Sequence, residues 1–489
     1  MEATEVPALP SKARLRVKLP RRCSVSPRKD AEGYGEPLSP TARLFRQPQF
    51  NCHILVFLGF GKKIHTDAVK AALESTLVRH PRFSSVQEID GSGRSRWVRT
   101  EVNLDDHVVY PGLGPVAADG DPIVGDRIVE NYASGLCCSA LDTSRPLWDL
   151  HILDIRTSEA AVVAVFRIHH SLGDGISLMS LFLACTRRTI DYESLPSLPV
   201  AHRRSSTAVS GSTIWILLSY LWTCLVYAWN TLISFLLFFS TAFFLKDSKT
   251  PLMGMKGVEY RQKRFAHCTL SFDDLRTIKN AMGSTINDVL VGVTSAALSR
   301  YLDRNHDGHL PRNLRIRSTL LVNIRPNTAI NALALTMKEG RRSNWGNRMG
   351  YVILNFPIMR CQDPLDYIRK GVEITQKKKK SLEVMFTFIS ALLIVKIFGV
   401  KAAVLLCHRV LSNTTLSFSN VVGPTDEVGF CGSPLVYIAP TVYGHPQAHL
   451  LCHNLHPWSS QSSPVMSPLP TPVETCLPLL YKGVTPSQH

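Results

Sequence analysis

The feature that most constrains the fold of this chain is a run of 34 residues, Ser212–Leu245, without a charged side chain. As one helix it would be about 50 Å long, more than the roughly 30 Å that a bilayer core requires. Trp and Tyr residues crowd its first half, and Arg203, Arg204 and Lys246 flank it. The run therefore predicts a membrane-associated segment between two folded halves.

Composition narrows the class of protein and its partners. A chain of 489 residues exceeds what one hydrophobic core usually serves, and 45% hydrophobic with 19% charged residues is typical of a globular protein. The formal net charge of +17 indicates an anionic partner. Zinc-finger spacing and basic heptads are missing, so we expect no nucleic acid and favour lipid headgroups or the phosphates of CoA. The 12 Cys are scattered without a CxxC pair, which indicates neither a zinc site nor a disulfide framework.

A histidine-containing turn, HHSLGDG at His169–Gly175, lies between a strand-like run at Ala160–His169 and a helix-like run at Ile176–Arg188. Loops at strand ends are where ligands commonly meet a sheet. Transfer of an acyl group to an alcohol needs a general base, and a histidine with a pKa near 6.5 suits that task at neutral pH. An HxxxD spacing alone is a weak pattern, but the whole heptapeptide after an apolar strand is more specific. His170 is our candidate base.

The other residues of the heptapeptide suit the same chemistry. Gly173 and Gly175 let a substrate approach the backbone closely. Asp174 can accept a hydrogen bond that fixes either the loop or the tautomer of the histidine ring. No third ligand follows at a suitable spacing, so we expect no metal site.

Hydrophobic periodicity predicts the remaining elements of an α/β protein. We expect strands at Asn51–Phe60, Leu147–Asp154, Leu320–Arg325 and Leu416–Val422, and helices at Thr66–His80 and Ser284–Arg300 and from Phe272 to Asn280. A second apolar run, Val384–Cys407, contains Lys396 and Lys401, which favours an amphipathic or core helix over a membrane span.

The heptapeptide resembles the HHxxxDG signature of the CoA-dependent acyltransferase superfamily. The longer run HHSLGDGISLMSLFLACTRR is similar to the plant wax ester synthase/diacylglycerol acyltransferases. Further matches follow in the order of that family: PLSPTARLF (37–45), HPRFSS (80–85), RPLWD (145–149), INDVL (286–290), VNIRP (322–326), WGN (345–347), DPLDYIR (363–369), SNVVGP (419–424) and VYGHPQA (442–448). The resemblance covers roughly residues 37–448.

The resemblance implies a two-lobed α/β fold of the CoA-dependent acyltransferase type, like that of chloramphenicol acetyltransferase, with a central tunnel. It makes His170 the general base, with His169, Asp174 and Gly175 supporting the motif. Asn287 and Asp288 match a second signature and would complete the site from the other lobe. Capping of the helix that follows Ser284-Thr285 is an equally good explanation of that pair, and both roles can coexist.

The implied reaction moves a fatty acyl group from acyl-CoA to a long-chain alcohol, to diacylglycerol, or to both, as a wax ester synthase or diacylglycerol O-acyltransferase. Acyl-CoA would be a co-substrate, and no permanently bound cofactor is expected. The alternatives are an acyltransferase for another hydroxylated acceptor and a catalytically impaired, membrane-associated lipid-binding protein. The family also implies the endoplasmic reticulum membrane, with the active site facing the cytosol, or the plasma membrane.

These observations divide the chain into segments. We expect a basic disordered tail at 1–36, a first lobe at 37–200, a linker with the apolar run at 201–257 and a second lobe at 258–448. A single membrane span would place His170 and Asn287 on opposite sides, which one shared active site forbids. A re-entrant hairpin turning near Asn230-Thr231, or a helix lying in the interface, is consistent with a shared site.

The last segment, 449–489, is rich in Pro and Ser, and the resemblance stops before it. Members of the family continue here with a further strand and a closing helix. We therefore expect a disordered tail, an exposed sheet edge and a thinner core in the second lobe.

Overall fold

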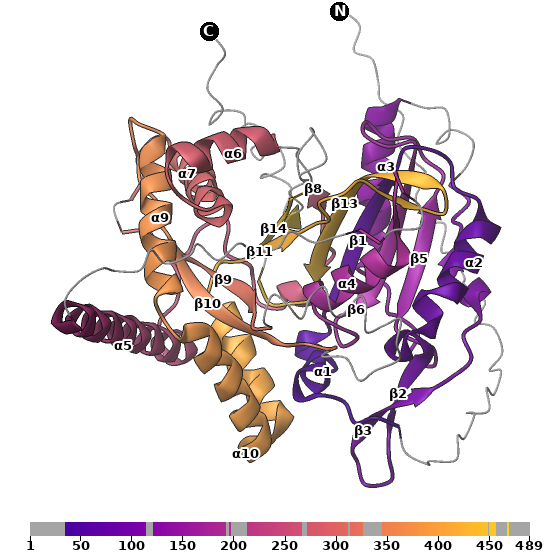
Figure 1. Ribbon diagram of the computed structural model, residues 1–489, viewed down its shortest axis with the longest axis horizontal. Coiled ribbons are helices and arrows are strands. Elements are labelled where there is room, and N and C mark those ends of the chain that lie inside the picture. Colours follow the sequence, from indigo (N-terminus) through magenta and orange to yellow (C-terminus); the bar gives the residue numbers. More distant parts are fainter. Residues whose placement is uncertain are drawn as a thin grey trace, which may run out of the picture.

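The computed structural model describes residues 35–113, 121–191, 195–196, 213–266, 271–311, 313–325, 345–447, 449–455 and 467–468. They form two α/β lobes that lie side by side, with one long helix extending from the second lobe (Figure 1). The expected tail, apart from Gly35 and Glu36, and residues 201–212 of the expected linker lie outside the described residues.

The N-terminal part of the chain contains α1 (Pro40–Phe45), β1 (His53–Phe60), α2 (Thr66–Ser75), β2 (Ser85–Ile89), β3 (Ser95–Arg99), β4 (Val108–Val109), α3 (Pro122–Leu136), β5 (Trp148–Leu153), β6 (Val162–His169), α4 (Gly175–Cys185) and β7 (Arg187–Arg188). The rest contains α5 (Thr213–Phe243), β8 (Phe265–Ala266), α6 (Phe272–Ala281), α7 (Ile286–Asn305), β9 (Ile316–Asn323), β10 (Met349–Phe356), α9 (Leu365–Lys379), α10 (Glu383–Ser412), β11 (Leu416–Val422), β12 (Val428–Phe430), β13 (Ser433–Tyr443), β14 (His449–Leu455) and β15 (Ser467–Pro468).

Most predicted elements are confirmed, and two helices end earlier than expected. The helix expected at Thr66–His80 stops at Ser75, where the hydroxyls of Ser75 and Thr76 both donate to the carbonyl of Ala72. Such side-chain bonds compete with the helical pattern. The helix expected to reach Arg188 stops at Cys185, because β7 leaves it to pair with β12.

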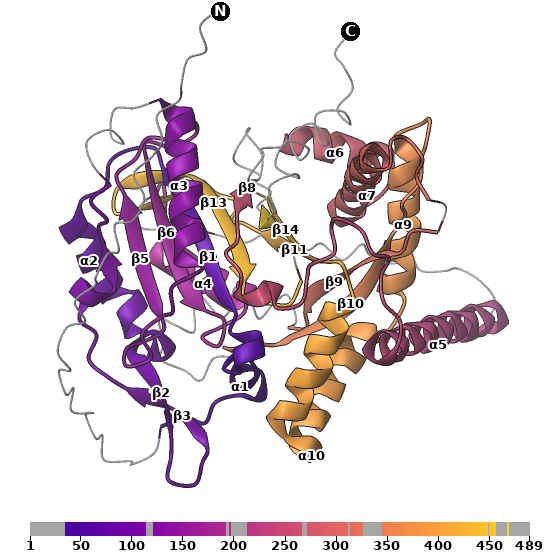
Figure 2. The same cartoon turned by 180° about the vertical axis from the view of Figure 1, so that it is seen from behind.

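The first lobe is built on a sheet of seven strands in the order β4-β5-β6-β1-β13-β12-β7. Its central strand, β1, is buried on both faces, which explains its unbroken apolar sequence. Leu55 and Phe57 pack in the same cluster as Val129 of α3, and Ile54 and Leu58 pack on the opposite side with residues of α2 and α4. Figure 2 shows α3 on the near face of this sheet.

The C-terminal half of the chain returns to this first sheet. β13 pairs antiparallel with β1 along most of its length, and β12 continues the sheet beyond it. The expected boundary, with all of 258–448 in the second lobe, is therefore wrong for β12 and β13. Without β13, the apolar strand β1 would have an open edge.

The second lobe has a four-stranded sheet in the order β10-β9-β11-β14. Helices α7 and α9 cover one face and cross closely at Gly292 and Gly371, where a side chain on either would collide with the other helix. β14 pairs in parallel with β11. The expectation that the resemblance stops before His449 and leaves this edge unpaired is thus wrong, because His449–Leu455 forms the strand that covers β11.

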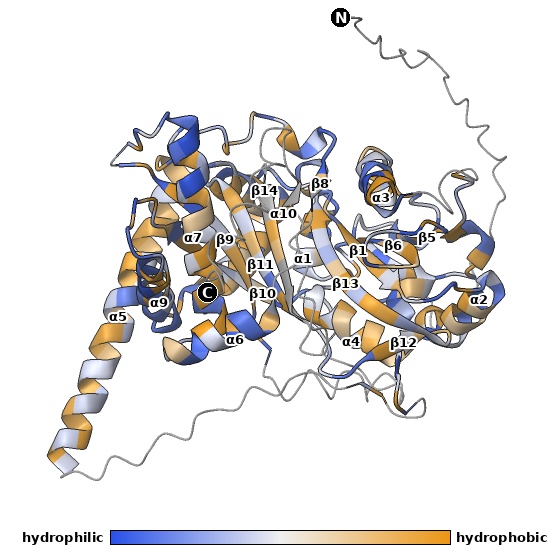
Figure 3. Ribbon diagram, turned by 90° about the horizontal axis from the view of Figure 1, so that it is seen from above, coloured by the Kyte–Doolittle hydropathy of each residue, from blue (hydrophilic) through white to orange (hydrophobic). Residues whose placement is uncertain are grey.

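Helices α5 and α10 pack on the other side of the second lobe. α5 is one continuous helix through Asn230-Thr231, so the hairpin expected as one alternative is not formed. Its last turns bury Phe238 and Ala242 against α10 and β10, whereas its first turns extend away from the protein (Figure 3). α10 is interrupted at Gly399, whose φ of 82° favours glycine. Both helices are long and apolar enough to cross a membrane.

Candidate active site

The histidine motif forms a buried turn between β6 and α4. β6 ends at His169, and the backbone N–H of His170 donates to the carbonyl of Cys52 at 2.9 Å. Asp174 is the N-cap of α4, its carboxylate accepting from the N–H of Ser177 at 2.9 Å. The strand, the turn and the cap thus fix the position of the two histidines.

His169 is held at both ring nitrogens. Its Nδ1 accepts from the backbone N–H of Ser171 at 3.2 Å, so its Nε2 carries the proton and donates to Oδ1 of Asn51 at 3.0 Å. The ring also packs edge-on against His53 at 5.0 Å between centroids. Burial, together with the nearby His53 and His170, lowers the pKa of His169 well below 6.5. A neutral ring with both nitrogens engaged suits the supporting role that the resemblance implies.

His170 is buried, but fewer hydrogen bonds hold its ring than hold the ring of His169. Its ring stacks on Phe45 of α1, 4.2 Å between centroids, and its Nδ1 has no hydrogen-bond partner among the described residues. Burial lowers its pKa from 6.5, while its own backbone carbonyl, Asp174 and Asn347 act in the opposite direction. The imidazole is therefore neutral at pH 7 and able to accept a proton.

Asp174 fixes the loop rather than the histidine ring. Its Oδ2 accepts from Nη1 of Arg325 at 2.6 Å and from the backbone N–H of Arg348 at 2.9 Å. Both side chains of the ion pair are almost completely buried. The sequence left open whether the loop or the ring is fixed, and the observed contacts favour the loop.

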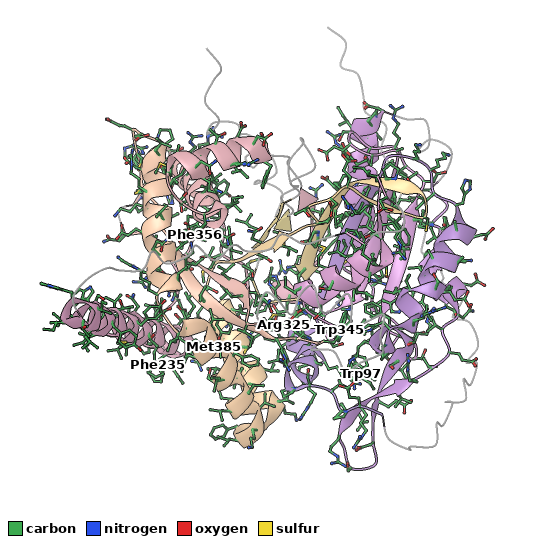
Figure 4. The ribbon with its side chains drawn as sticks, in the orientation of Figure 1. Trp97, Phe235, Arg325, Trp345, Phe356 and Met385 are labelled. Carbon is green, nitrogen blue, oxygen red and sulfur yellow. The ribbon has the colours of Figure 1, made fainter. Side chains whose placement is uncertain are left out.

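Residues Trp345–Arg348 of the second lobe also form hydrogen bonds with the motif. Nε1 of Trp345 donates to the carbonyl of Leu172 at 2.7 Å, and Nδ2 of Asn347 donates to the carbonyl of His170 at 3.0 Å. Trp345 lies 3.2 Å from where a Cβ on Gly173 would be, so any larger residue there would crowd the Trp345 ring. Figure 4 shows Arg325 and Trp345 at the junction of the two lobes.

Sequence reasoning placed Arg325, Trp345 and Asn347 inside matching motifs but gave them no role. The available signal was the carboxylate of Asp174, since a buried charge is stable only when it is paired. Nothing in the spacing along the chain identifies a partner that lies 151 residues away.

Asn287 and Asp288 stand at the start of α7, away from the motif contacts. Asp288 forms a capping box with Thr285, and its carboxylate also bonds to Lys379 at 2.7 Å and Thr375 at 2.6 Å. Asn287 accepts from Asn420 of β11. The capping role of Asp288 is therefore present, and no contact with His170 is among the interactions of the described residues. A role of this pair in the reaction stays a prediction.

Two cavities meet the motif. The N-lobe cavity lies between the sheet and α4 and touches Gly175; it is lined by Ile54, Val56, Leu58, Leu73, Leu77, Phe83, Leu150, Phe166, Ile168, Leu178, Met179, Leu181, Phe182, Cys185, Val421, Phe430, Ile438 and Pro440. Its wall carries almost no polar group, as a site for a hydrocarbon chain requires.

The interlobe cavity, of about 140 Å³, has His170 in its wall. Residues of α1 and α10 form its apolar side, including Leu44, Phe45, Phe388, Ala391, Leu392 and Val395. Thr319, Ser417, His445 and Gln447 form a polar side together with His170. A neutral base thus faces a cavity that accommodates an apolar molecule with a polar end.

Solved structures share this architecture. The wax ester synthase/diacylglycerol acyltransferase from Marinobacter aquaeolei VT8 is 17% identical with a TM-score of 0.56, covering 92% of this chain and 98% of that one. The first condensation domain of the calcium-dependent antibiotic synthetase is 11% identical with a TM-score of 0.54, over 93% and 95%. The starter condensation domain of rhizomide synthetase, solved in complex with C8-CoA and Leu-SNAC, is 12% identical with a TM-score of 0.50, over 92% and 91%. The two-lobed fold of the CoA-dependent acyltransferase type is therefore confirmed.

Sequence comparison identifies the family. The model "Wax ester synthase/diacylglycerol acyltransferase catalytic domain" matches residues 52–290, and "WS/DGAT C-terminal domain" matches residues 345–456. Wax ester synthase/diacylglycerol acyltransferase 11 of Arabidopsis thaliana is 45% identical, covering 84% of this chain and 86% of the relative. Wax ester synthase/diacylglycerol acyltransferase 5 of the same plant is 43% identical, covering 86% of this chain and 87% of the relative.

The chain belongs to the wax ester synthase/diacylglycerol acyltransferase family. The resemblance and the O-acyltransferase class inferred from the sequence are confirmed. The alternative of a lipid-binding protein without activity is not favoured by these matches. The C-terminal match extends to residue 456, past the point where the sequence resemblance was expected to stop.

Proposed function

We propose that this protein transfers a fatty acyl group from acyl-CoA to a long-chain alcohol or diacylglycerol, with His170 as the general base. One observation carries the proposal: His170 is a buried, neutral histidine, stacked on Phe45, in the wall of a largely apolar cavity. Clamping of its loop by Arg325, Trp345 and Asn347 supports a preorganised base.

The reaction needs one base and no covalent intermediate. His170 takes the proton of the acceptor hydroxyl, and the oxygen attacks the thioester carbonyl carbon. The tetrahedral intermediate collapses, the C–S bond breaks, and the CoA thiolate takes the proton back from the imidazolium of His170. The products are the ester and free CoA, and the base returns to its neutral form.

The linings of the two cavities suggest which substrate each of them binds. The N-lobe cavity has the apolar wall that a fatty acyl chain requires, and Gly175 of the motif is part of that wall. The interlobe cavity has both His170 and an apolar side, as an alcohol-bearing lipid requires. Its volume of about 140 Å³ is close to that of cavities that hold one small organic molecule. A long acceptor chain must therefore extend beyond it, between α1 and α10.

The outer face of α10 supports delivery of the acceptor from a membrane. Its exposed apolar residues recur every four positions at Met385, Ile389, Leu393 and Ile397, and α5 adds exposed Trp, Leu and Phe side chains beside it. The opposite face of the same helix lines the interlobe cavity. An acceptor dissolved in the bilayer would thus reach His170 without crossing water.

A helix lying in the interface fits this arrangement better than a span. The two lobes are joined by buried contacts such as Asp174–Arg325, so both stand on one side of any membrane. If α5 crossed the bilayer, the preceding chain, which contains Arg203, Arg204 and several Ser, would have to cross back. Arg203 and Arg204 would be costly to place in hydrocarbon. We propose that the protein binds the cytosolic face of the endoplasmic reticulum membrane.

The test is ester formation by the full chain in microsomes from a host without wax ester synthesis. Labelled palmitoyl-CoA is supplied with hexadecanol or dioleoylglycerol, and the lipid products are separated. His170→Ala should lower ester formation about 100-fold or more. His309→Ala, an exposed histidine of the second lobe, is the matched control and should leave it unchanged. Full activity of His170→Ala, or no ester from the unmodified chain with either acceptor, would overturn the proposal.

A further inference from the structure

A second buried histidine, His445, lies near the first because of the sheet topology. β6 and β13 flank β1 and run in the same direction, and His53 of β1 pairs with both His169 and Tyr443. His170 follows the end of β6, and His445 follows the end of β13. Strands two places apart in a sheet are roughly 10 Å from each other, so the two histidines leave the same edge of the sheet side by side.

Cys52, which directly precedes β1, contacts both of these segments. The carbonyl of Cys52 accepts from the N–H of His170 at 2.9 Å, and its thiol donates to the carbonyl of Gly444 at 3.4 Å. Gly444 has a φ of 91°, and a Cβ there would lie 2.3 Å from the carbonyl oxygen of Asn51. The turn that carries His445 is therefore packed directly against the chain that positions His170.

Gln447 fixes the other side of this turn. Its Oε1 accepts from Oγ1 of Thr319 at 3.2 Å, and its Nε2 donates to Oγ1 of Thr414 at 2.7 Å and to the carbonyl of Leu416 at 2.8 Å. The amide has partners at both of its polar atoms, so it acts as a brace between the turn and the second lobe. His445 is thus held in place in the wall of the interlobe cavity.

The ring of His445 has one N–H group without a hydrogen-bond partner among the described residues. Its Nδ1 accepts from the backbone N–H of Gln447 at 3.4 Å, so in the neutral ring the proton is on Nε2. That Nε2 is buried and has no partner among the described residues, and the residue is only 9% exposed. Burial, together with Lys263 and His170, lowers the pKa of His445 to about 3. At neutral pH it is an uncharged hydrogen-bond donor.

The acceptors of the proposed function differ in what they offer to such a donor. A long-chain alcohol has one oxygen, the hydroxyl that must meet His170. Diacylglycerol has its free hydroxyl and, a few bonds away, two ester carbonyl oxygens that accept hydrogen bonds. A second donor in the same cavity wall as the base suits the second kind of acceptor.

We propose that Nε2–H of His445 donates a hydrogen bond to an ester carbonyl of bound diacylglycerol, so that this residue favours glycerolipids over simple alcohols as acceptors. The inference rests on the proposed acyltransferase function and names the acceptor class at the same site. His445 contacts the acceptor away from the reacting atoms. It is a specificity residue and takes no part in proton transfer.

The test compares acceptors in His445→Leu and His445→Gln, assayed as the full chain in microsomes. His445→Leu removes the donor and should lower kcat/KM for dioleoylglycerol about 10- to 100-fold while changing that for hexadecanol little. His445→Gln keeps an N–H donor at the end of the side chain and should restore most of the preference. The unmodified protein should also prefer dioleoylglycerol to the dialkylglycerol ether, which lacks the carbonyls, and His445→Leu should lose that preference.

The outcomes separate this inference from the proposed function. A parallel fall with both acceptors would show that His445 serves the reacting atoms or the fold, and no change with either would show that it contacts no acceptor; both results overturn the inference alone. The ether comparison uses the unmodified protein, so it decides the matter even if a variant fails to fold: equal use of diacyl and dialkyl acceptors overturns the inference. Absence of ester from every acceptor overturns the proposed function as well.

Discussion

Asp174 of the first lobe and Arg325 of the second form a buried ion pair, with Oδ2 and Nη1 2.6 Å apart and side chains 5% and 1% exposed. The pair joins the loop of the candidate base to the opposite lobe. Arg325→Met would leave the carboxylate of Asp174 buried without its cation, which costs about 3–5 kcal/mol. We expect a clear drop in the thermal melting temperature, and a loss of ester formation because His170 is no longer held.

A surface pair provides the control for this variant. Lys63 and Asp154 lie 3.2 Å apart with side chains 72% and 59% exposed, and exposed pairs contribute about 0–1 kcal/mol. Lys63→Met should therefore melt close to the unmodified protein. The double variant Asp174→Asn/Arg325→Met should regain part of the lost stability, since it leaves no unpaired charge. A melting temperature of Arg325→Met equal to that of Lys63→Met would contradict the importance of the buried pair.

Local sequence patterns could predict the parts of the site that depend on neighbouring residues. The apolar strand, the turn and the helix around His170 follow one another along the chain, and the structure has them as β6, the motif and α4. The capping of α7 by Thr285 and Asp288 was also one of the two predicted explanations, and it depends on a spacing of three residues.

Long-range pairings could not be predicted, because no local preference encodes them. The partner of Asp174 comes from the other lobe, and β13 returns to pair with β1 across 375 to 390 residues of sequence. The segment His449–Leu455 has no clear strand pattern by itself, and it becomes a strand because β11 offers an edge to it. Gln447 and His445, which brace and line the interlobe cavity, gave no signal beyond their place in a matching motif.

The pH dependence of the reaction should follow the protonation of His170. Only the neutral ring accepts a proton, so kcat/KM should rise with pH through the pKa of His170 and then level off. Burial lowers that pKa from 6.5, so the midpoint of the rise should lie below pH 6.5 and activity should fall in more acidic buffer. The check is kcat/KM for palmitoyl-CoA at saturating hexadecanol between pH 5 and 9. A limb with an apparent pKa above 7 would contradict the assignment.

The N-lobe cavity should set the length of the acyl group. Leu178 of α4 is a partly buried residue of its wall, and Leu178→Trp would fill space without disturbing a fully buried position. We expect activity with palmitoyl-CoA to fall about tenfold or more relative to decanoyl-CoA, since single methylene groups in apolar pockets already change rates that much.

A tryptophan on the outside of the same lobe controls for general effects of the bulky residue. Ile123 of α3 is 60% exposed, and Ile123→Trp should keep the chain-length profile of the unmodified protein. The measurement is the ratio of ester formed from the two acyl-CoAs at equal concentration. An unchanged ratio in Leu178→Trp would place the acyl chain elsewhere.

Binding to a membrane should depend on the outer face of α10. Ile389 and Leu393 are 47% and 50% exposed there, and carboxylates at both positions would have to enter the lipid or pull the helix away from it. Ile389→Glu/Leu393→Glu should therefore float with phosphatidylcholine/phosphatidylserine vesicles about tenfold less. Its activity on a short alcohol dissolved in buffer should persist, because neither residue lines the interlobe cavity.

Ile123→Glu/Ile190→Glu, at positions 60% and 86% exposed on the first lobe, is the matched control and should float normally. Flotation of the α10 variant equal to that of this control would mean that the protein meets the bilayer through another surface.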